Sequence, residues 1–179
     1  MSYADYLAFE AGAATKHEYV NGAVVAMAGG SFEHARLQGR LALRFGLLAE
    51  AAGCDVLSSD ARVRIVATGR STYPDLTVVC GDRVPAEDDA DATTNPVLVV
   101  EVPSKTTAES DRGEKWAHYQ RLPSLRAYLL VSQDESRLEL FERAEEAATW
   151  TYREARAGAS LPIAALGGTL DVDDVYGAA

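Results

Sequence analysis

The sequence predicts a mixed α/β fold, in which a central sheet is combined with β-hairpins and two principal helices. Short apolar runs rich in Val recur through the middle of the chain, as is typical of buried strands. Two longer segments carry apolar or capping residues at helical spacing. Strands and helices do not alternate strictly, so a doubly wound fold is not expected. The 179 residues suit one domain, expected over residues 1–179.

The N-terminal region predicts a short helix and then a hairpin. Residues 2–11 have apolar positions suited to a helix, and Ser2 is the expected cap. Residues 17–20 (HEYV) and 23–27 (AVVAM) are separated by Asn21-Gly22. Asn-Gly supplies the positive φ angles of a two-residue turn, so these runs predict a β-hairpin.

A long helix is predicted next, capped by Ser31, ending near Ala52 and stopped by Gly53. Its buried stripe is expected to comprise Leu37, Leu41, Phe45 and Leu48. A second stripe contains Arg36, Arg40 and Arg44. A solvated face is the favoured interpretation of these arginines, and a face that tracks phosphates is the alternative.

The rest of the chain predicts further strands and a second helix. The helix is expected over 111–122, because Asp111-Arg112-Gly113-Glu114 resembles a capping box and Pro123 marks a break. An acidic loop is expected over 81–95. The predicted strands cover about 55–57, 61–66, 73–80, 97–102, 128–131, 137–142 and 149–153.

The composition limits the classes of partner. The net charge of −10 counts against a generic nucleic-acid-binding module, although less against an enzyme with a local metal ion. Residues 87–91 and 171–174 hold seven of the 27 acids and are expected to be solvated. No membrane span or signal peptide is expected, which favours the cytoplasm. Cys54 and Cys80 are expected to be free thiols in a reducing compartment.

Two acidic residues stand at the ends of predicted buried strands. Asp75 follows Tyr73-Pro74, and Glu101 ends the run Val97-Leu98-Val99-Val100. A carboxylate in such a place needs a partner, a proton or a metal ion. If the two strands pair, the carboxylates converge and suit Mg²⁺ or Mn²⁺, which prefer oxygen ligands. From the residues alone, structural acids and a metal site are equally good interpretations.

Lys115 is the next candidate, because it lies in the first turn of the helix that follows Glu101. An ammonium group beside a bound water positions the water, helps to deprotonate it, or stabilises developing charge. The structural alternative is an i, i+4 ion pair with Asp111.

Five segments resemble the Uma2-like family, which is described as restriction-endonuclease-like and is also catalogued as a domain of unknown function. The segments are KHEYVNG (16–22), MAGGSFEH (27–34), YPDL (73–76), VVEV (99–102) and DRGEK (111–115). They occur in the family's order over about two thirds of the chain, roughly residues 16–131. The resemblance implies the PD-(D/E)xK nuclease fold, a restriction-endonuclease-like core with a central mixed sheet flanked by helices.

The same resemblance implies roles for individual residues. Asp75 and Glu101 would be the metal-binding carboxylates for Mg²⁺ or Mn²⁺. The usual lysine two residues after the second acid is replaced by Pro103, and Lys115 would take its place. Lys105, in the altered segment Pro103–Thr106, is a rival for the same role.

Glu18 and His34 also match family positions. Glu18 would complete the metal shell or orient a water, with a cross-strand ion pair as the structural alternative. For His34 a site role and a helix cap or surface role are weighed equally. The implied partners are nucleic acid, with DNA expected first, and a second copy of the chain in a homodimer.

The sequence therefore predicts a Mg²⁺-dependent endonuclease acting on phosphodiester bonds. A catalytically impaired member serving as a DNA-associated or protein-interaction module is the first alternative. A metal-dependent hydrolase of a small phosphate ester is the second. A basic groove lined by Arg36, Arg40 and Arg44 would favour nucleic acid, and a closed acidic rim would favour the small ester.

Overall fold

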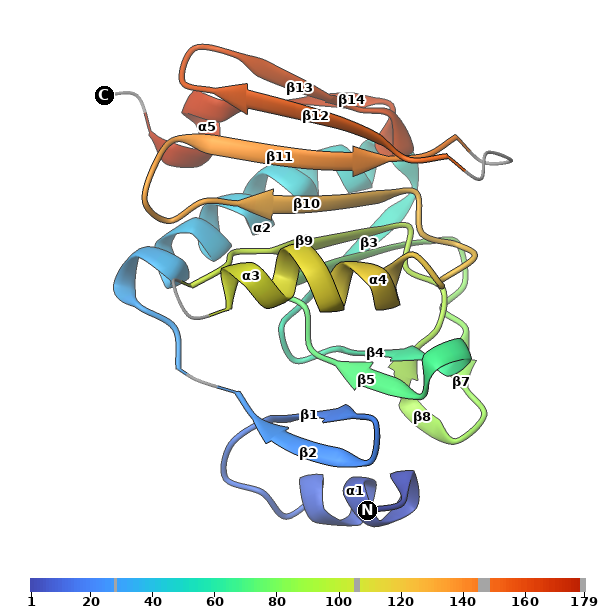
Figure 1. Ribbon diagram of the computed structural model, residues 1–179. Helices are drawn as coiled ribbons and strands as arrows, with labels where there is room; N and C mark the ends of the chain where they lie inside the picture. The colour runs from blue at the N-terminus through green and yellow to red at the C-terminus, as the bar shows by residue number, and fades with distance from the viewer. Residues whose placement is uncertain (28, 105–106, 145–148, 178–179) are drawn as a thin grey trace.

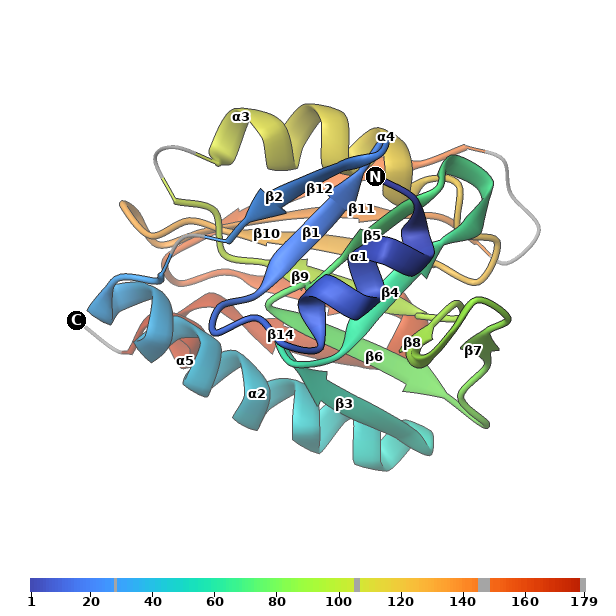
Figure 2. The same ribbon diagram turned by 90° about the horizontal axis from the view of Figure 1, so that it is seen from below.

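The computed structural model describes residues 1–27, 29–104, 107–144 and 149–177 (Figure 1). It has a mixed α+β architecture, in which helices flank a central mixed sheet. Figure 2 shows helix α2 (Phe32–Ala52) and the α3–α4 segment on opposite sides of this sheet. The predicted fold class is confirmed.

The central sheet has six strands in the order β12-β11-β10-β9-β6-β3. Strands β9 and β10 are parallel, and the other neighbours are antiparallel. The strands are β3 (Cys54–Ser58), β6 (Leu76–Cys80), β9 (Leu98–Glu101), β10 (Ala127–Val131), β11 (Arg137–Glu142) and β12 (Thr151–Arg156).

A second sheet lies beside the first and contains the N-terminal hairpin (Figure 1). Its order is β2-β1-β5-β4-β8-β7, and its β4–β8 pair is parallel. The strands are β1 (His17–Val20), β2 (Ala23–Ala26), β4 (Arg62–Ile65), β5 (Arg70–Thr72), β7 (Pro85–Ala86) and β8 (Asp89–Thr93). A separate hairpin joins β13 (Ser160–Ile163) to β14 (Gly168–Asp171).

The helices include one long element and several short ones. Besides α2, they are α1 (Tyr3–Glu10), α3 (Ala108–Ser110), a π-helical turn (Asp111–Lys115), α4 (Trp116–Tyr119), α5 (Val172–Tyr176), and 3₁₀ turns at Val66–Thr68 and Ala164–Leu166. None of the helices in the described ranges is long and apolar enough to cross a membrane.

Apolar side chains fill both faces of the central sheet. On one face, α2 packs Leu37, Leu41 and Phe45 against β6 and β9. On the other face, Tyr119 and Leu122 belong to a cluster that includes Val99. Because successive side chains of a strand point to opposite faces, Glu101 shares the α4 face with Val99.

The predicted local signals of the first 53 residues are confirmed. Ser2 and Asp5 form a reciprocal capping box at α1. Asn21 and Gly22 have φ angles of 50° and 84°, as the tight turn between β1 and β2 requires. Ser31 caps α2, which ends at Gly53 in the left-handed conformation.

The arginine stripe on α2 is only partly solvated, because its side chains also contact the C-terminal helix α5. Arg36 forms an ion pair with Glu33 and donates to the Tyr176 carbonyl oxygen. Arg40 donates to the Asp174 carbonyl oxygen, and Arg44 lies 2.9 Å from the Asp174 carboxylate. The stripe therefore helps to hold α5 on α2, and its arginines are not a free series of cations.

The acidic segments are also less solvated than expected. Residues 81–95 contain β7 and β8, so the expected loop is wrong. Asp89 on β8 is buried, and it accepts two hydrogen bonds from Arg62 and one from the Tyr3 hydroxyl. Burial of a carboxylate requires such partners, and the sequence run did not reveal them.

The expectation of two free thiols is wrong. Strands β3 and β6 pair with Cys54 directly opposite Cys80, and the two residues form a disulfide with Cα atoms 4.1 Å apart. The thiols therefore lend no support to a reducing compartment. Cytoplasmic localisation stays a prediction.

Candidate active site

The carboxylates of Asp75 and Glu101 lie side by side because β6 and β9 pair. Leu76 lies opposite Val100 in this antiparallel pair. Continuing the register by one residue places Asp75 opposite Glu101. The expected strand 73–80 is divided, since β5 ends at Thr72 and β6 begins at Leu76. Asp75 therefore lies in the short connection just before β6.

A π-helical turn brings two more charged groups to the same place. The helix expected from Asp111 begins at Ala108 instead, so the predicted capping box is wrong. Asp111–Lys115 adopts the wider π conformation, which recurs at functional sites. In this turn Asp111 is buried, and Lys115 lies beside it on the same side.

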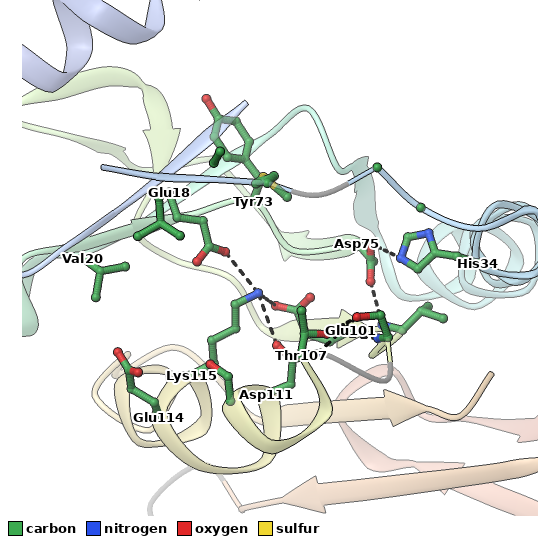
Figure 3. Close-up of a pocket in the computed structure, with 18 of the residues that line it drawn as sticks. Glu18, Val20, His34, Tyr73, Asp75, Glu101, Thr107, Asp111, Glu114 and Lys115 are labelled. Atoms are coloured by element: carbon green, nitrogen blue, oxygen red, sulfur yellow. Dashed lines mark hydrogen bonds and ion pairs between the residues drawn. The ribbon is translucent and has the colours of Figure 1, made fainter. Parts of the chain in front are cut away.

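The Lys115 ammonium group is enclosed by carboxylates (Figure 3). Its Nζ atom lies 3.1 Å from Glu18 Oε1, 3.3 Å from Glu101 Oε1 and 3.3 Å from Asp111 Oδ1. Three carboxylates match the three protons of an ammonium group. Although burial opposes the charge, the three acids raise the pKa of Lys115 far above its ordinary value. Lys115 is therefore a fixed cation.

Glu18 reaches this cluster from β1 of the second sheet. Its carboxylate accepts from Arg70 at 2.8 Å and from the Thr72 hydroxyl, both on β5. Although burial opposes ionisation, Lys115, Thr72 and Arg70 together lower the pKa of Glu18. The cross-strand ion pair and the position beside the candidate site are thus both present.

Asp75 is held by donors from α2 and from the end of β9. Gln38 donates at 2.7 Å, and the Val102 amide donates at 2.6 Å. His34 Nε2 lies 3.1 Å from Asp75 Oδ1. This hydrogen bond outweighs burial and raises the pKa of His34, which favours the imidazolium form.

Glu101 is buried in the cluster, with 5% of its surface exposed. Its Oε1 atom accepts from the Tyr119 hydroxyl at 2.7 Å as well as from Lys115. Burial, with Lys115 acting in the opposite direction and Asp75 and Asp111 reinforcing it, raises the pKa of Glu101 to about 8. The positive charge of Lys115 therefore does not fully compensate for the burial of the Glu101 carboxylate.

These side chains open into a cavity of about 370 Å³. Figure 3 shows the acids converging on it from β1, β9, the Asp75 connection and the π turn. The sequence-predicted residues Glu18, His34, Asp75, Glu101 and Lys115 all line it. Lys105, the rival lysine, lies outside the described residues.

The charges of the cavity leave room for a cation. Glu18, Asp75, Glu101 and Asp111 carry four negative charges when ionised, against two positive charges on Arg70 and Lys115. With His34 neutral and Glu101 ionised, the balance is −2, and the exposed Glu114 at the rim adds to it. Without a metal ion, the raised pKa values of Glu101 and His34 favour protons on both groups, which offset this negative charge. A divalent cation would neutralise this balance, and carboxylate oxygens are the ligands that Mg²⁺ and Mn²⁺ prefer.

The described residues contain no group of three or more His, Cys, Asp or Glu side chains already arranged around one metal position. The donors fit in chemistry: Asp75 and Glu101 are adjacent, and Glu101 Oε2 takes no hydrogen bond within the described residues. An ion would thus be held by two carboxylates together with water, as is usual for Mg²⁺.

Several residues of the site were missed from the sequence. Asp111 was expected only as a helix cap, and its spacing of four from Lys115 was interpreted as a surface pair. Tyr119, a further four residues on, binds Glu101. This i, i+4, i+8 series was the available signal. No sequence signal pointed to Arg70 or Gln38, because their partners Glu18 and Asp75 lie 52 and 37 residues away.

The arrangement places the chain among restriction-endonuclease-like nuclease folds. A crystal structure described as a "putative nuclease belonging to DUF820" from Anabaena variabilis superimposes with a TM-score of 0.71. The superposition covers 89% of each chain at 14% sequence identity, so it demonstrates the shared fold.

The sequence identifies the family. Residues 3–173 match the model of the Uma2 family, described as "Putative restriction endonuclease". The chain belongs to this family. It is 34% identical over 176 residues to the uncharacterized protein slr1290 of Synechocystis sp., covering 98% of this chain and 91% of that protein. The uncharacterized protein sll1609 of the same organism is 31% identical over 143 residues, covering 80% and 81%.

Proposed function

We propose that the chain is a Mg²⁺- or Mn²⁺-dependent endonuclease that hydrolyses phosphodiester bonds of nucleic acid, with DNA as the first candidate. The family and the fold support a nuclease. The observation that carries the finer proposal is the pairing of Asp75 with Glu101 beside Lys115 in one cavity.

In this proposal Asp75 and Glu101 hold the metal ion. The bound ion supplies a Lewis acid for the phosphate and a water of lowered pKa. Gln38 and the Val102 amide fix the Asp75 carboxylate before any ligand arrives. Tyr119 does the same for Glu101. Such preorganisation reduces the rearrangement needed during reaction.

Lys115 acts as a cation and not as a base. Its three carboxylate neighbours favour the protonated form, so it would not remove a proton from water near neutral pH. Its positive charge can stabilise the charge that develops on the phosphate, whereas orienting the water would require one of its three N–H donors to leave a carboxylate. Glu18 and His34 are secondary: Glu18 directs Lys115, and His34 holds Asp75.

Metal binding and hydrolysis should be measured on the same preparations. Titration calorimetry with Mn²⁺ is expected to show binding to the wild-type protein and none to Asp75→Ala. Hydrolysis of single-stranded and plasmid DNA should require Mg²⁺ or Mn²⁺ and be lost in the same variant. Asp55→Ala, which removes an exposed carboxylate on β3, is the matched control and should behave as wild type. Identical metal responses of wild type and Asp75→Ala would contradict the proposal.

The non-catalytic alternative predicts a different pattern. A protein-interaction or DNA-associated module would not lose its binding when the metal is removed. The absent lysine at position 103 favours this alternative, but the position of the Lys115 ammonium group 3.3 Å from Glu101 supports the enzyme. Metal binding without hydrolysis of any nucleic acid would select the alternative. The proposed homodimer can be measured independently by light scattering.

A further inference from the structure

The cavity has a charged floor and an apolar wall. Asp75, Glu101 and Asp111 form the floor, and Glu101 and Asp111 have only 5% and 2% of their surfaces exposed. The wall comes from the β1–β2 hairpin and the residue that follows it. It consists of Val20, Val25, Ala26 and Met27. Val25 is 48% exposed, so this wall reaches the surface.

The cavity has the scale of a small-molecule site. Its volume of about 370 Å³ is near the lower end for ligand pockets, roughly 300 to 1,000 Å³. A rigid duplex cannot lower a phosphate to a floor that is so deeply buried without leaving its helical path. A single nucleotide that has left the base stack can place its phosphate at this floor, as in enzymes that extrude their target base.

The cations that line the cavity are already paired. Among the described lining residues, Arg70 contacts Glu18 and Glu114, Lys115 contacts three carboxylates, and His34 contacts Asp75. The arginines of α2, the other basic series noted in the sequence, are bound to Glu33 and α5. Tracking a long duplex backbone requires several free cations. Neither the described lining residues nor the α2 arginines supply such a series.

We infer that the cavity accepts one nucleotide at a time, with its phosphate toward the Asp75–Glu101 floor and its base against the Val20–Met27 wall, so that the substrate is a single strand or a nucleotide ester and not an intact duplex. This inference rests on the proposed phosphodiesterase function. It adds the class of substrate and the surface that selects it. Apolar contact with a base is independent of sequence, because every base has an apolar face.

Salt dependence of binding measures the number of phosphates engaged. The logarithm of the binding constant falls with the logarithm of salt concentration by about 0.7 per phosphate for single strands and 0.9 for duplexes. One or two phosphates in the cavity give a slope of about −1. A duplex tracked over six or more phosphates gives a slope of about −5 or steeper.

The probes are a fluorescent 12-nucleotide DNA strand with phosphorothioate linkages, its duplex, and a p-nitrophenyl ester of thymidine 5′-phosphate. Fluorescence anisotropy with Mg²⁺ should show single-strand binding at least tenfold tighter than duplex binding, with a slope near −1. Competition by the nucleotide ester indicates that free nucleotides enter. Its failure to compete, with strand binding intact, restricts the site to polymeric single strands.

The wall is tested by Val25→Asp, which places a charge on a half-exposed position. Single-strand binding should weaken at least tenfold, whereas Val66→Asp, at an exposed valine outside the cavity, should leave it unchanged. Duplex binding as tight as single-strand binding, a slope of −5 or steeper, or an unaffected Val25→Asp variant would overturn the inference. These are binding measurements, so they are distinct from failure of the proposed function, which would appear as metal-independent or absent hydrolysis of every substrate.

Discussion

The buried carboxylate of Glu101 makes stability depend on pH when no metal is bound. Its pKa rises from the ordinary 4.5 to about 8 on folding. Between these values the folded protein binds a proton that the unfolded chain releases. Stability is therefore greatest at low pH in this window and falls as the pH rises toward 8. Replacement of Glu101 by the uncharged, isosteric glutamine removes this contribution.

The size of the effect follows from the width of the window. Each pKa unit corresponds to about 1.4 kcal/mol, so a change of about 3.5 units gives at most about 5 kcal/mol. Water in the cavity and movement of the side chain reduce this upper limit. For a chain of this length, 1 kcal/mol shifts Tm by roughly 2–4 °C. The wild-type Tm in EDTA should therefore fall by about 10 °C between pH 5 and pH 9.

The assay is thermal unfolding by circular dichroism in EDTA at half-unit steps of pH. Glu101→Gln should match the wild type near pH 5 and be more stable at pH 9. A smaller slope should remain in the variant, because the raised pKa of His34 also contributes stability that is lost as the pH rises. Glu139→Gln, a buried carboxylate on β11 held by Arg112 and Arg137, is the control and should keep the wild-type slope. Parallel curves for wild type and Glu101→Gln would refute the reasoning.

Three further predictions concern the cluster, the disulfide and the C-terminal helix. Lys115→Met leaves three carboxylates without their shared cation, so urea unfolding at pH 8 should show a loss of about 3 kcal/mol, and an unchanged midpoint would contradict this. Reduction of the Cys54–Cys80 disulfide, whose ends have a sequence separation of 26, should lower the free energy of unfolding by about 2–4 kcal/mol, and Cys54→Ser/Cys80→Ser should no longer respond to dithiothreitol. Arg44→Ala breaks one contact to α5, so hydrogen exchange at residues 172–176 should accelerate while β9 stays protected.

Local signals predicted the ends of the first elements of the chain, although not the start of the helix near Asp111. Ser2, Ser31, Asn21 and Gly53 each act through neighbours a few residues away, and each has the expected conformation. The approach of Asp75 to Glu101 was predicted on the condition that their strands pair, which β6 and β9 do. A buried strand pair leaves little freedom of register, because a slip of one residue would exchange its faces.

Partners distant in the sequence could not be predicted in this way. The spacing of Arg36, Arg40 and Arg44 fixes their common face but not what covers it, and α5 lies more than 130 residues away. The Cys54–Cys80 bond depends on the β3–β6 register, which emerges from packing of the whole sheet. The π turn at Asp111–Lys115 has no propensity signal of its own, so its two inward-facing charges were assigned to an ordinary helix.

The contact between α5 and α2 links the last described helix to the floor of the cavity. The carbonyl oxygens of Tyr176 and Asp174 accept hydrogen bonds from the arginines of α2. The first turns of α2 also carry His34 and Gln38, which contact the Asp75 carboxylate. A continuous series of contacts thus connects α5 through α2 to Asp75. We expect a fusion or a cut near position 172 to disturb the position of the Asp75 carboxylate, so recombinant tags are better placed at the N-terminus. Substitutions at this contact should therefore alter the proposed metal site without changing Asp75 or Glu101 themselves.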